Sequence, residues 1–147
     1  MQPDEKDVRI LTLLRENARL PVADLARQLG LARTTVQARI ERLESSGVIA
    51  GYTLRTSRFT RPALRATALV AIEPRSGPTV LGRLRSLPGV EVVHTTSGRF
   101  DLLVQIVART TEELDDTLDR IGEASGVRSS ESLIHLSTKL DRTAQPT

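Results

Sequence analysis

The sequence predicts an α+β protein made of two units, a helical N-terminal third and a second unit in which strands and helices alternate. Two observations support this prediction. Apolar residues recur at helical spacing from residue 5 to residue 45, and segments of strand composition alternate with amphipathic helices from residue 66 onward. The segment RTSRFTRP, residues 55–62, has linker composition. We therefore expect a first domain at 1–54, a linker at 55–64, a second domain at 65–140 and a tail at 141–147.

Composition excludes several classes of protein. Apolar residues make up 39% of the 147 residues, so a packed core is expected. No run of about 18 apolar residues is present, so we expect no membrane-spanning helix and a cytoplasmic protein. The chain has no cysteine, which excludes disulfides and thiolate metal sites, and no motif in it implies a cofactor.

The positive charge is concentrated in the first part of the chain. The net charge is +3. Residues 1–60 carry ten lysine or arginine residues against seven acidic ones, whereas residues 61–147 carry eleven of each. This distribution fits a nucleic-acid-binding domain followed by a neutral partner domain.

Two helices are predicted before residue 30. Asp4 can cap a first helix over residues 5–16. Pro21 suits the start of a second helix over residues 21–29, and Gly30 suits the left-handed residue that ends it.

The third helix follows almost at once and ends at Gly47. The small Ala26 permits close approach of the second and third helices, Gly30 permits the sharp turn, and Val36 fills the angle between them. This spacing predicts a helix-turn-helix. The alternative is a three-helix bundle with no ligand.

The third helix has two different faces. Val36, Ile40 and Leu43 lie at i, i+4 and i+7 and predict a buried stripe. The other side is basic and polar and is the candidate DNA-contacting surface. With Arg55 beyond the helix as a phosphate ligand, the candidate DNA-binding residues are Arg33, Thr34, Thr35, Gln37, Ala38, Arg39, Arg42 and Arg55. Of these, Arg33, Thr34 and Gln37 are the candidates for base edges.

A short hairpin is predicted after the third helix. Val48-Ile49 and Tyr52-Thr53-Leu54 flank Ala50-Gly51, which is compatible with the wing of a winged helix. One such module buries too little surface for tight specific binding to double-stranded DNA. A homodimer is therefore expected.

The second unit is predicted to have the order βαββαβ. This order implies a four-stranded antiparallel sheet with both helices on one face. The expected elements are a strand at 66–73, a helix at 78–87, strands at 90–96 and 100–108, a helix that starts with a capping box at 110–113 and closes at Gly126, and a strand at 128–138.

The strand at 100–108 is apolar on both faces. Phe100, Leu102, Val104 and Ile106 alternate with Asp101, Leu103, Gln105 and Val107. The two helices can cover only one face, so we expect the other to pack on a second copy of the chain. The alternative is a loosely alternating sheet with a few exposed aliphatic residues. Phe100 is the only aromatic residue on these strands, which argues against base stacking of RNA on the sheet.

Three stretches carry a family resemblance: LRENARLPVADLARQLGL, VQARIERLESSGVIAGY and VEVVHTTSGRFDLLVQI. The second is close to the run V-x-x-R-[IV]-x-x-L-E-x-x-G-[VI]-I, and the third contains a G-x-x-D signature as Gly98 and Asp101. In these stretches the chain resembles the Lrp/AsnC, or feast/famine, family of transcriptional regulators, over roughly residues 4–139. The resemblance implies a winged helix-turn-helix joined to a ferredoxin-like sensor (RAM) domain, and dimers through the sensor sheets that often form tetramers or octamers.

The resemblance also implies an amino-acid effector, bound between dimers near the turn from the second to the third sensor strand. Carried to this chain, it gives the candidate effector-binding residues Thr95, Thr96, Ser97, Gly98, Arg99 and Asp101. Hydroxyls and backbone amides can hold a carboxylate, and Asp101 can accept an ammonium group. The alternative is structural: Gly98 supplies a positive φ and Asp101 forms a hydrogen bond with the turn.

The chain departs from the family pattern at three positions. Pro21 and Ala32 stand where the family usually has serine caps, and Arg99 replaces an acidic or small residue. Loss of the hydroxyl at residue 32 removes a cap that contributes about 1 kcal/mol.

Two other functions remain open. A sirohaem-decarboxylase-like enzyme of the same build would use a histidine, and His94 lies at the sensor turn. An effector-independent, architectural DNA-binding protein is the second. The chain shows no catalytic triad, metal-ligand spacing or phosphate loop, so a non-enzymatic regulator is the leading hypothesis.

Overall fold

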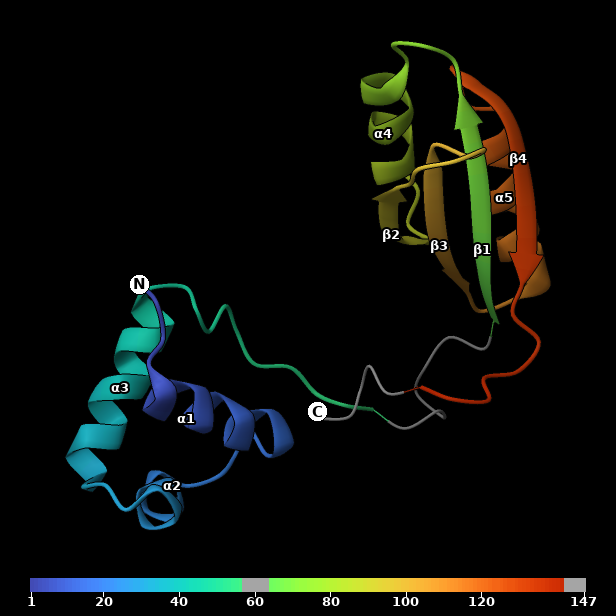
Figure 1. The fold of residues 1–147 in the computed structure, drawn as a ribbon. Helices are drawn as coiled ribbons and strands as arrows, with labels where there is room; N and C mark the ends of the chain where they lie inside the picture. Colours follow the sequence, from blue (N-terminus) through green and yellow to red (C-terminus); the bar gives the residue numbers. More distant parts are fainter. Residues whose placement is uncertain (57–63, 142–147) are drawn as a thin grey trace. The chain divides into compact units, whose positions relative to one another are not determined.

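The structure is a computed structural model that describes residues 1–56 and 64–141. Most of the predicted linker at 55–64, and the tail at 141–147 beyond its first residue, lie outside the described residues. The chain divides into two compact units, one built on Met1–Arg55 and one spanning Thr56–Thr138 (Figure 1). Within the described ranges, no helix is long and apolar enough to cross a membrane.

The first unit consists of three helices, α1 (Glu5–Glu16), α2 (Val22–Leu29) and α3 (Arg33–Ser45). The centre of their core is formed by the fully buried side chains of Ile10, Leu25, Val36 and Leu43. The predicted stripe of α3 is therefore buried as expected, and the helix-turn-helix is confirmed.

The turn between α2 and α3 has the predicted geometry. Gly30 has a φ of +65°, and its N–H donates to the carbonyl oxygens of Ala26 and Arg27. Glycine adopts this left-handed conformation without a steric penalty. Pro21 and Ala32 precede α2 and α3 with extended backbone and no side-chain cap. The two helices thus begin without the hydroxyl caps that the family usually supplies.

The predicted hairpin is not formed. Residues 48–54 contain no strand, although Ile49 is anchored by a 2.9 Å hydrogen bond from its N–H to the Leu43 carbonyl oxygen. Gly51 does not adopt the positive φ that the favoured two-residue hairpin turns require. An isolated two-stranded hairpin is also marginally stable at best. Local composition therefore overestimated strand formation here.

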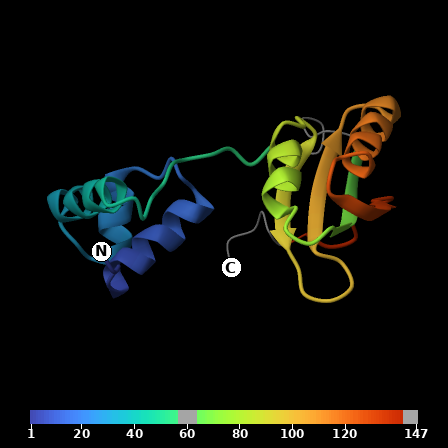
Figure 2. The same cartoon turned by 90° about the horizontal axis from the view of Figure 1, so that it is seen from above.

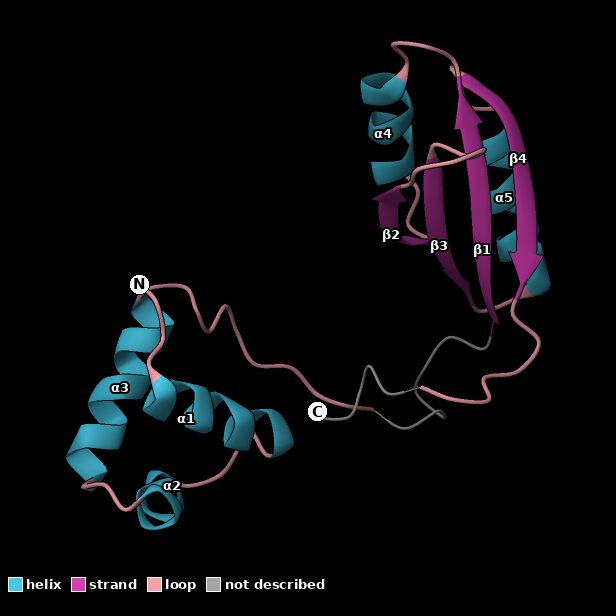
Figure 3. Ribbon diagram, in the orientation of Figure 1, coloured by secondary structure: helices cyan, strands magenta, loops and turns pink. Residues whose placement is uncertain are grey.

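The second unit is an antiparallel sheet in the order β2-β3-β1-β4, with two helices packed on one face (Figures 1 and 3). The elements are β1 (Leu64–Ile72), α4 (Gly77–Arg85), β2 (Val90–Thr95), β3 (Leu102–Ala108), α5 (Thr111–Gly122) and β4 (Val127–Ile134). This confirms the α+β class, the βαββαβ order and the coverage of one face.

The core of this unit lies between the sheet and the helices. Ala66, Ala68 and Val70 of β1 alternate with half-buried residues, as do Leu102, Val104 and Ile106 of β3. They pack against Val80 and Leu84 of α4 and Leu114 and Ile121 of α5.

Element boundaries differ from the prediction by a few residues at several elements; β1, for example, spans Leu64–Ile72 rather than 66–73. β3 starts at Leu102 rather than at residue 100, and β4 ends at Ile134 rather than at residue 138. Phe100 and Asp101 belong to the preceding turn. The start of α5 also differs slightly: Thr110 Oγ1 accepts from the Glu113 N–H, but the Glu113 carboxylate accepts from the Arg109 N–H rather than from the cap residue.

Candidate nucleic-acid interface and sensor turn

The polar face of α3 is exposed along its first half. Its exposed side chains are Arg33, Thr34, Thr35, Gln37 and Ala38. The Gln37 Nε2 donates to Glu41 Oε1 at 3.0 Å, which orients the amide along the helix surface. The face combines one guanidinium, hydroxyls and an amide, the groups that hydrogen-bond to base edges in the major groove.

Arg39 and Arg42 lie on the candidate face but have partners that the sequence did not indicate. Both side chains pair with carboxylates at the start of α1. Arg39 Nη1 lies 2.8 Å and 2.9 Å from the two carboxylate oxygens of Asp4, and 2.9 Å from Asp7 Oδ1. Arg42 Nη2 lies 3.0 Å from Asp7 Oδ2. These two arginines therefore join α3 to α1 rather than standing free on the exposed face.

The same two carboxylates cap α1. The Asp7 N–H donates to Asp4 Oδ1 at 2.9 Å, and the Asp4 N–H donates to Asp7 Oδ2 at 3.1 Å. This is a reciprocal capping box made by two aspartates. The hydrogen bond from Arg39 to Asp4 is the largest cause that lowers the pKa of Asp4 to about 2, and the same bond raises the pKa of Arg39.

Sequence reasoning identified Asp4 as a cap and missed Asp7 altogether. Asp7 is only 1% exposed, although it is charged. The spacing of Asp4 and Asp7 matched a capping box and could have indicated their mutual bonds. Their partners on α3 lie more than thirty positions away and leave no local pattern.

Arg55 lies beyond the helices, in a stretch without regular structure. Its Nη2 donates to the Glu16 carbonyl oxygen at 3.3 Å, at the end of α1. Its guanidinium is exposed on the first unit, the unit that carries the candidate DNA-contacting helix.

The candidate effector-binding residues lie together in and beside the turn between β2 and β3, which extends past the ends of both strands (Figure 2). Gly98 has a φ of +108°. Thr96 Oγ1 donates to the Phe100 carbonyl oxygen at 2.7 Å. Arg99 lies 4.9 Å from the centroid of the Phe100 ring and 3.3 Å from the Glu131 carboxylate. The turn is thus held by contacts within it and by the pair of Arg99 with Glu131 on β4. Thr95, Ser97 and Gly98 are exposed.

Asp101 connects the turn to the central strand β1. Its Oδ2 accepts from the Ile72 N–H at 2.8 Å, and its own N–H donates to the Val70 carbonyl oxygen at 2.9 Å. The side chain therefore has a structural role, although its partner lies on β1 and not in the turn. The side chain is exposed.

Neither histidine lies in a catalytic arrangement within the described ranges. His94 is exposed on β2, and His135 Nε2 lies 2.8 Å from Thr67 Oγ1. In those ranges, no group of three or more histidine, aspartate or glutamate side chains is placed to hold a metal ion.

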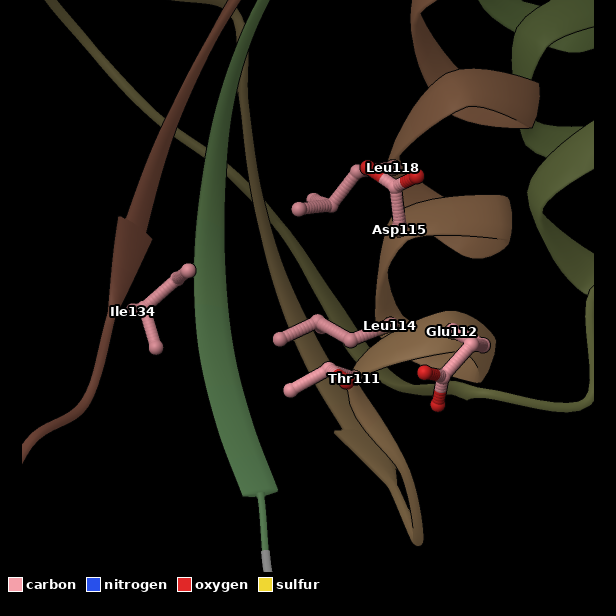
Figure 4. Close-up of a pocket in the computed structure, with 6 residues that line it drawn as sticks. All are labelled: Thr111, Glu112, Leu114, Asp115, Leu118 and Ile134. Carbon is pink, nitrogen blue, oxygen red and sulfur yellow. The ribbon is translucent and has the colours of Figure 1, made fainter.

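A pocket of about 370 Å³ lies between α5 and β4. Figure 4 shows Leu114 and Leu118 extending from α5 toward the strands, with Ile134 on β4 opposite them. Among the residues that the structure describes, its lining contains no cationic side chain, so this lining does not suit the carboxylate of an amino acid. The turn between β2 and β3 therefore remains the better candidate for an amino-acid site.

Two family models match the chain, one for each unit. The model described as "Winged helix-turn-helix DNA-binding" matches residues 3–50. The model described as "Lrp/AsnC ligand binding domain" matches residues 65–145.

Named relatives match almost the whole chain. The HTH-type transcriptional regulator LysM of Saccharolobus solfataricus is 32% identical and covers 92% of this chain and 94% of its own. The HTH-type transcriptional regulator FL11 of Pyrococcus horikoshii is 31% identical and covers 97% and 95%. These names support a regulator over the decarboxylase alternative.

Solved structures agree with the same assignment. Escherichia coli AsnC has a TM-score of 0.88 at 26% identity and covers 97% of this chain and 98% of its own. The leucine response regulatory protein LrpA of Mycobacterium tuberculosis has a TM-score of 0.74 at 30% identity and covers 95% and 96%. The chain belongs to the Lrp/AsnC family and is a DNA-binding transcriptional regulator of that type.

Proposed function

We propose that α3 contacts base edges in the major groove through Arg33, Thr34 and Gln37, as one half of a two-fold DNA site. The observation that supports this is the exposed polar face of α3, which lies opposite a buried apolar stripe. Thr35 and Ala38 complete this face, and Arg55 is the phosphate ligand beyond it. Base contacts specify sequence, whereas phosphate contacts fix position.

The test compares substitutions of the two kinds of contact. Arg33→Ala or Gln37→Ala removes a base contact that contributes about 1–3 kcal/mol, so sequence preference should relax. Arg55→Ala should weaken binding to all sequences alike and reduce the salt dependence. Arg120→Ala on α5 is the matched control, because it also removes one exposed guanidinium. Wild-type protein that shows no preference for a selected duplex over random duplex at moderate salt would contradict the proposal.

We propose that the uncovered face of the sensor sheet forms a homodimer. Leu69 and Leu103 are partners in the register of β1 and β3 and point away from the helices, since their neighbours along each strand are buried under those helices. Leu133 extends this apolar surface on β4 and is 50% exposed. A two-fold pairing of this surface gives the two copies of α3 that a specific DNA site requires.

Leu103→Asp tests the dimer by placing a charge at the centre of that face. Its mass by light scattering should fall to that of a monomer, because an unpaired charge is costly to bury. Thr79→Asp on α4 is the matched control, since residue 79 is exposed on the helix-covered side. A dimer that persists in Leu103→Asp at micromolar concentration places the interface elsewhere. We also propose that these dimers assemble further into a tetramer or an octamer. Light scattering of the wild-type protein would measure the mass of that assembly.

We propose that the turn between β2 and β3 binds an amino acid. The match to an Lrp/AsnC ligand binding domain supports this, as does the relative named a leucine response regulatory protein. Arg99 offers a cation for the carboxylate, and Asp101 offers an exposed carboxylate for the ammonium group. Thr95, Thr96, Ser97 and Gly98 supply hydroxyls and backbone amides around them.

Two variants of Asp101 separate ligand binding from turn structure. Asp101→Asn keeps an acceptor for the Ile72 N–H but removes the charge, whereas Asp101→Ala removes both. In a thermal-shift screen of amino acids, a ligand at 100 times its dissociation constant should stabilise the wild type by about 2.7 kcal/mol. Asp101→Asn should fold like the wild type and lose that response. If no amino acid raises the unfolding midpoint of the wild type, an effector-independent DNA-binding protein becomes the better description. The bonds that Thr96 and Asp101 make within the sensor domain favour that second candidate.

A further inference from the structure

The three arginines of α3 fall into two groups. Arg33 is exposed at the start of the helix. Arg39 and Arg42 are turned back onto the carboxylates of Asp4 and Asp7, at distances of 2.8–3.2 Å. Two positive and two negative charges thus compensate one another beside the proposed DNA-contacting face.

This cluster borders the surface that would meet DNA. Arg39 and Arg42 line the same shallow hollow as Thr34, Thr35 and Ala38. The Arg42 side chain is 51% exposed and that of Asp4 is 53% exposed, whereas that of Arg39 is 20% exposed. A phosphate near this hollow would therefore meet two guanidinium groups that already have carboxylate partners, and one exposed carboxylate that repels it.

The electrostatics of DNA binding give this arrangement a consequence. Non-specific affinity rises with the number of phosphates that lysine and arginine neutralise, because each one releases counterions. An arginine that keeps its carboxylate partner adds no such contact. Sequence preference depends instead on side chains that reach base edges. Withholding two arginines therefore lowers binding to every sequence by a similar factor and leaves base recognition to other side chains.

We propose that Asp4 and Asp7 compete with DNA phosphates for Arg39 and Arg42, and so limit the binding of DNA irrespective of sequence. The proposal rests on α3 being the helix that faces DNA. Asp7 supplies the buried, permanent part of the restraint, since it is only 1% exposed and bonds both arginines. Asp4 is half exposed, so water or a phosphate can replace its bond to Arg39.

Asp4→Asn is the variant that tests this with least disturbance of the fold. Asparagine caps helices as well as aspartate does, so the bond from the Asp7 N–H is retained while the charge on residue 4 is removed. Asp116→Asn on α5 is the matched control, because it removes one carboxylate from an exposed ion pair, with Arg120, in the other unit. Unfolding curves of both variants establish that they fold.

The measurement is the affinity of the full chain for random-sequence duplex as a function of salt. In Asp4→Asn, Arg39 keeps its bond to Asp7 but loses the exposed carboxylate that competes with DNA, so its remaining N–H groups can contact one further phosphate. The slope of log affinity against log salt should then steepen by up to about 0.9 per protomer. The advantage of the variant over the wild type should then shrink about threefold between 50 and 200 mM salt, as that slope requires. Asp116→Asn should match the wild type.

An Arg39→Gln background shows whether Asp4 affects DNA binding through Arg39. If Asp4 acts through Arg39, adding Asp4→Asn to Arg39→Gln should give no further gain. The proposal is overturned if Asp4→Asn leaves random-duplex binding unchanged or weaker, or if its gain persists in the Arg39→Gln background. Should Arg39→Gln fail to fold, Asp4→Ser, which also keeps a capping oxygen without the charge, must reproduce the gain. Random-duplex binding does not require Arg33 or Gln37 to recognise bases, so failure of base recognition and failure of this inference give different results.

Discussion

Gly98 and Gly126 provide a paired test of the sensor domain. Both have positive φ, +108° and +94°. A Cβ added to Gly98 would have no atom within 4 Å, whereas a Cβ on Gly126 would lie 2.6 Å from Ser76 Cβ and 3.1 Å from Val80 Cγ2. The two alanine variants therefore share backbone strain but differ in crowding.

Backbone strain and crowding set the expected loss of unfolding free energy. Left-handed backbone costs an alanine about 1–2 kcal/mol, and the reduced freedom of the unfolded chain offsets about 0.4–1 kcal/mol of that. Gly98→Ala should therefore lose about 0–1.6 kcal/mol. Gly126→Ala should lose a further 1–3 kcal/mol, roughly the cost of overpacking a core, because Ser76 or Val80 must move.

The assay is thermal unfolding of the full chain followed by circular dichroism, at one fixed protein concentration because any self-association shifts the midpoint. For a unit of this size, 1 kcal/mol corresponds to about 4–8 °C. Gly126→Ala should unfold at least about 4 °C below Gly98→Ala. If Gly98→Ala were the less stable of the two, the assignment of Gly98 to an open turn and of Gly126 to a crowded contact would be refuted.

Three further predictions concern stability. The pKa of Asp4 is lowered from 3.8 to about 2, so its ionised form stabilises the fold above about pH 4, and this contribution is lost as the pH falls toward 2. Between about pH 4 and pH 2, the free energy of unfolding should therefore depend less on pH in Asp4→Asn than in the wild type. Thr110→Ala removes the acceptor of the Glu113 N–H at the start of α5 and should cost about 1 kcal/mol by denaturant titration, whereas Thr110→Ser should cost much less. Leu43→Ala leaves a cavity at a fully buried position of the first unit and should cost about 2–5 kcal/mol. DNA binding should then be lost at a lower temperature, while the second unit keeps its own unfolding midpoint. A wild-type midpoint for both units would contradict the packing of Leu43.

Local patterns predicted the elements of this chain well because helix and strand periodicity is a property of adjacent residues. The stripe of Val36 and Leu43 indicated the buried face of α3, and Gly30 indicated the turn before it. The hairpin at 48–54 was wrong because a short hairpin depends on partners that composition does not reveal.

The candidate site was predictable in part for the same reason. Arg39 and Arg42 lie on a polar helical face by periodicity, and nothing nearby in the sequence shows that α1 presents carboxylates to them. Asp101 was correctly placed beside the turn, but its acceptor role toward the Ile72 N–H depends on the pairing of β3 with β1. Pairings between distant segments therefore account for what the sequence left undetermined.

The double role of Asp4 links folding to DNA binding. Its side chain accepts from the Asp7 N–H to start α1 and pairs with Arg39 of α3, so the same carboxylate stabilises the first unit and occupies a potential phosphate ligand. Any duplex that draws Arg39 to a phosphate must break that pair, and its strength is then subtracted from the binding free energy. A duplex held by base contacts from Arg33 and Gln37 can keep the pair intact and incurs no such loss. The stability of the helix-turn-helix is therefore coupled to the affinity of this unit for phosphates.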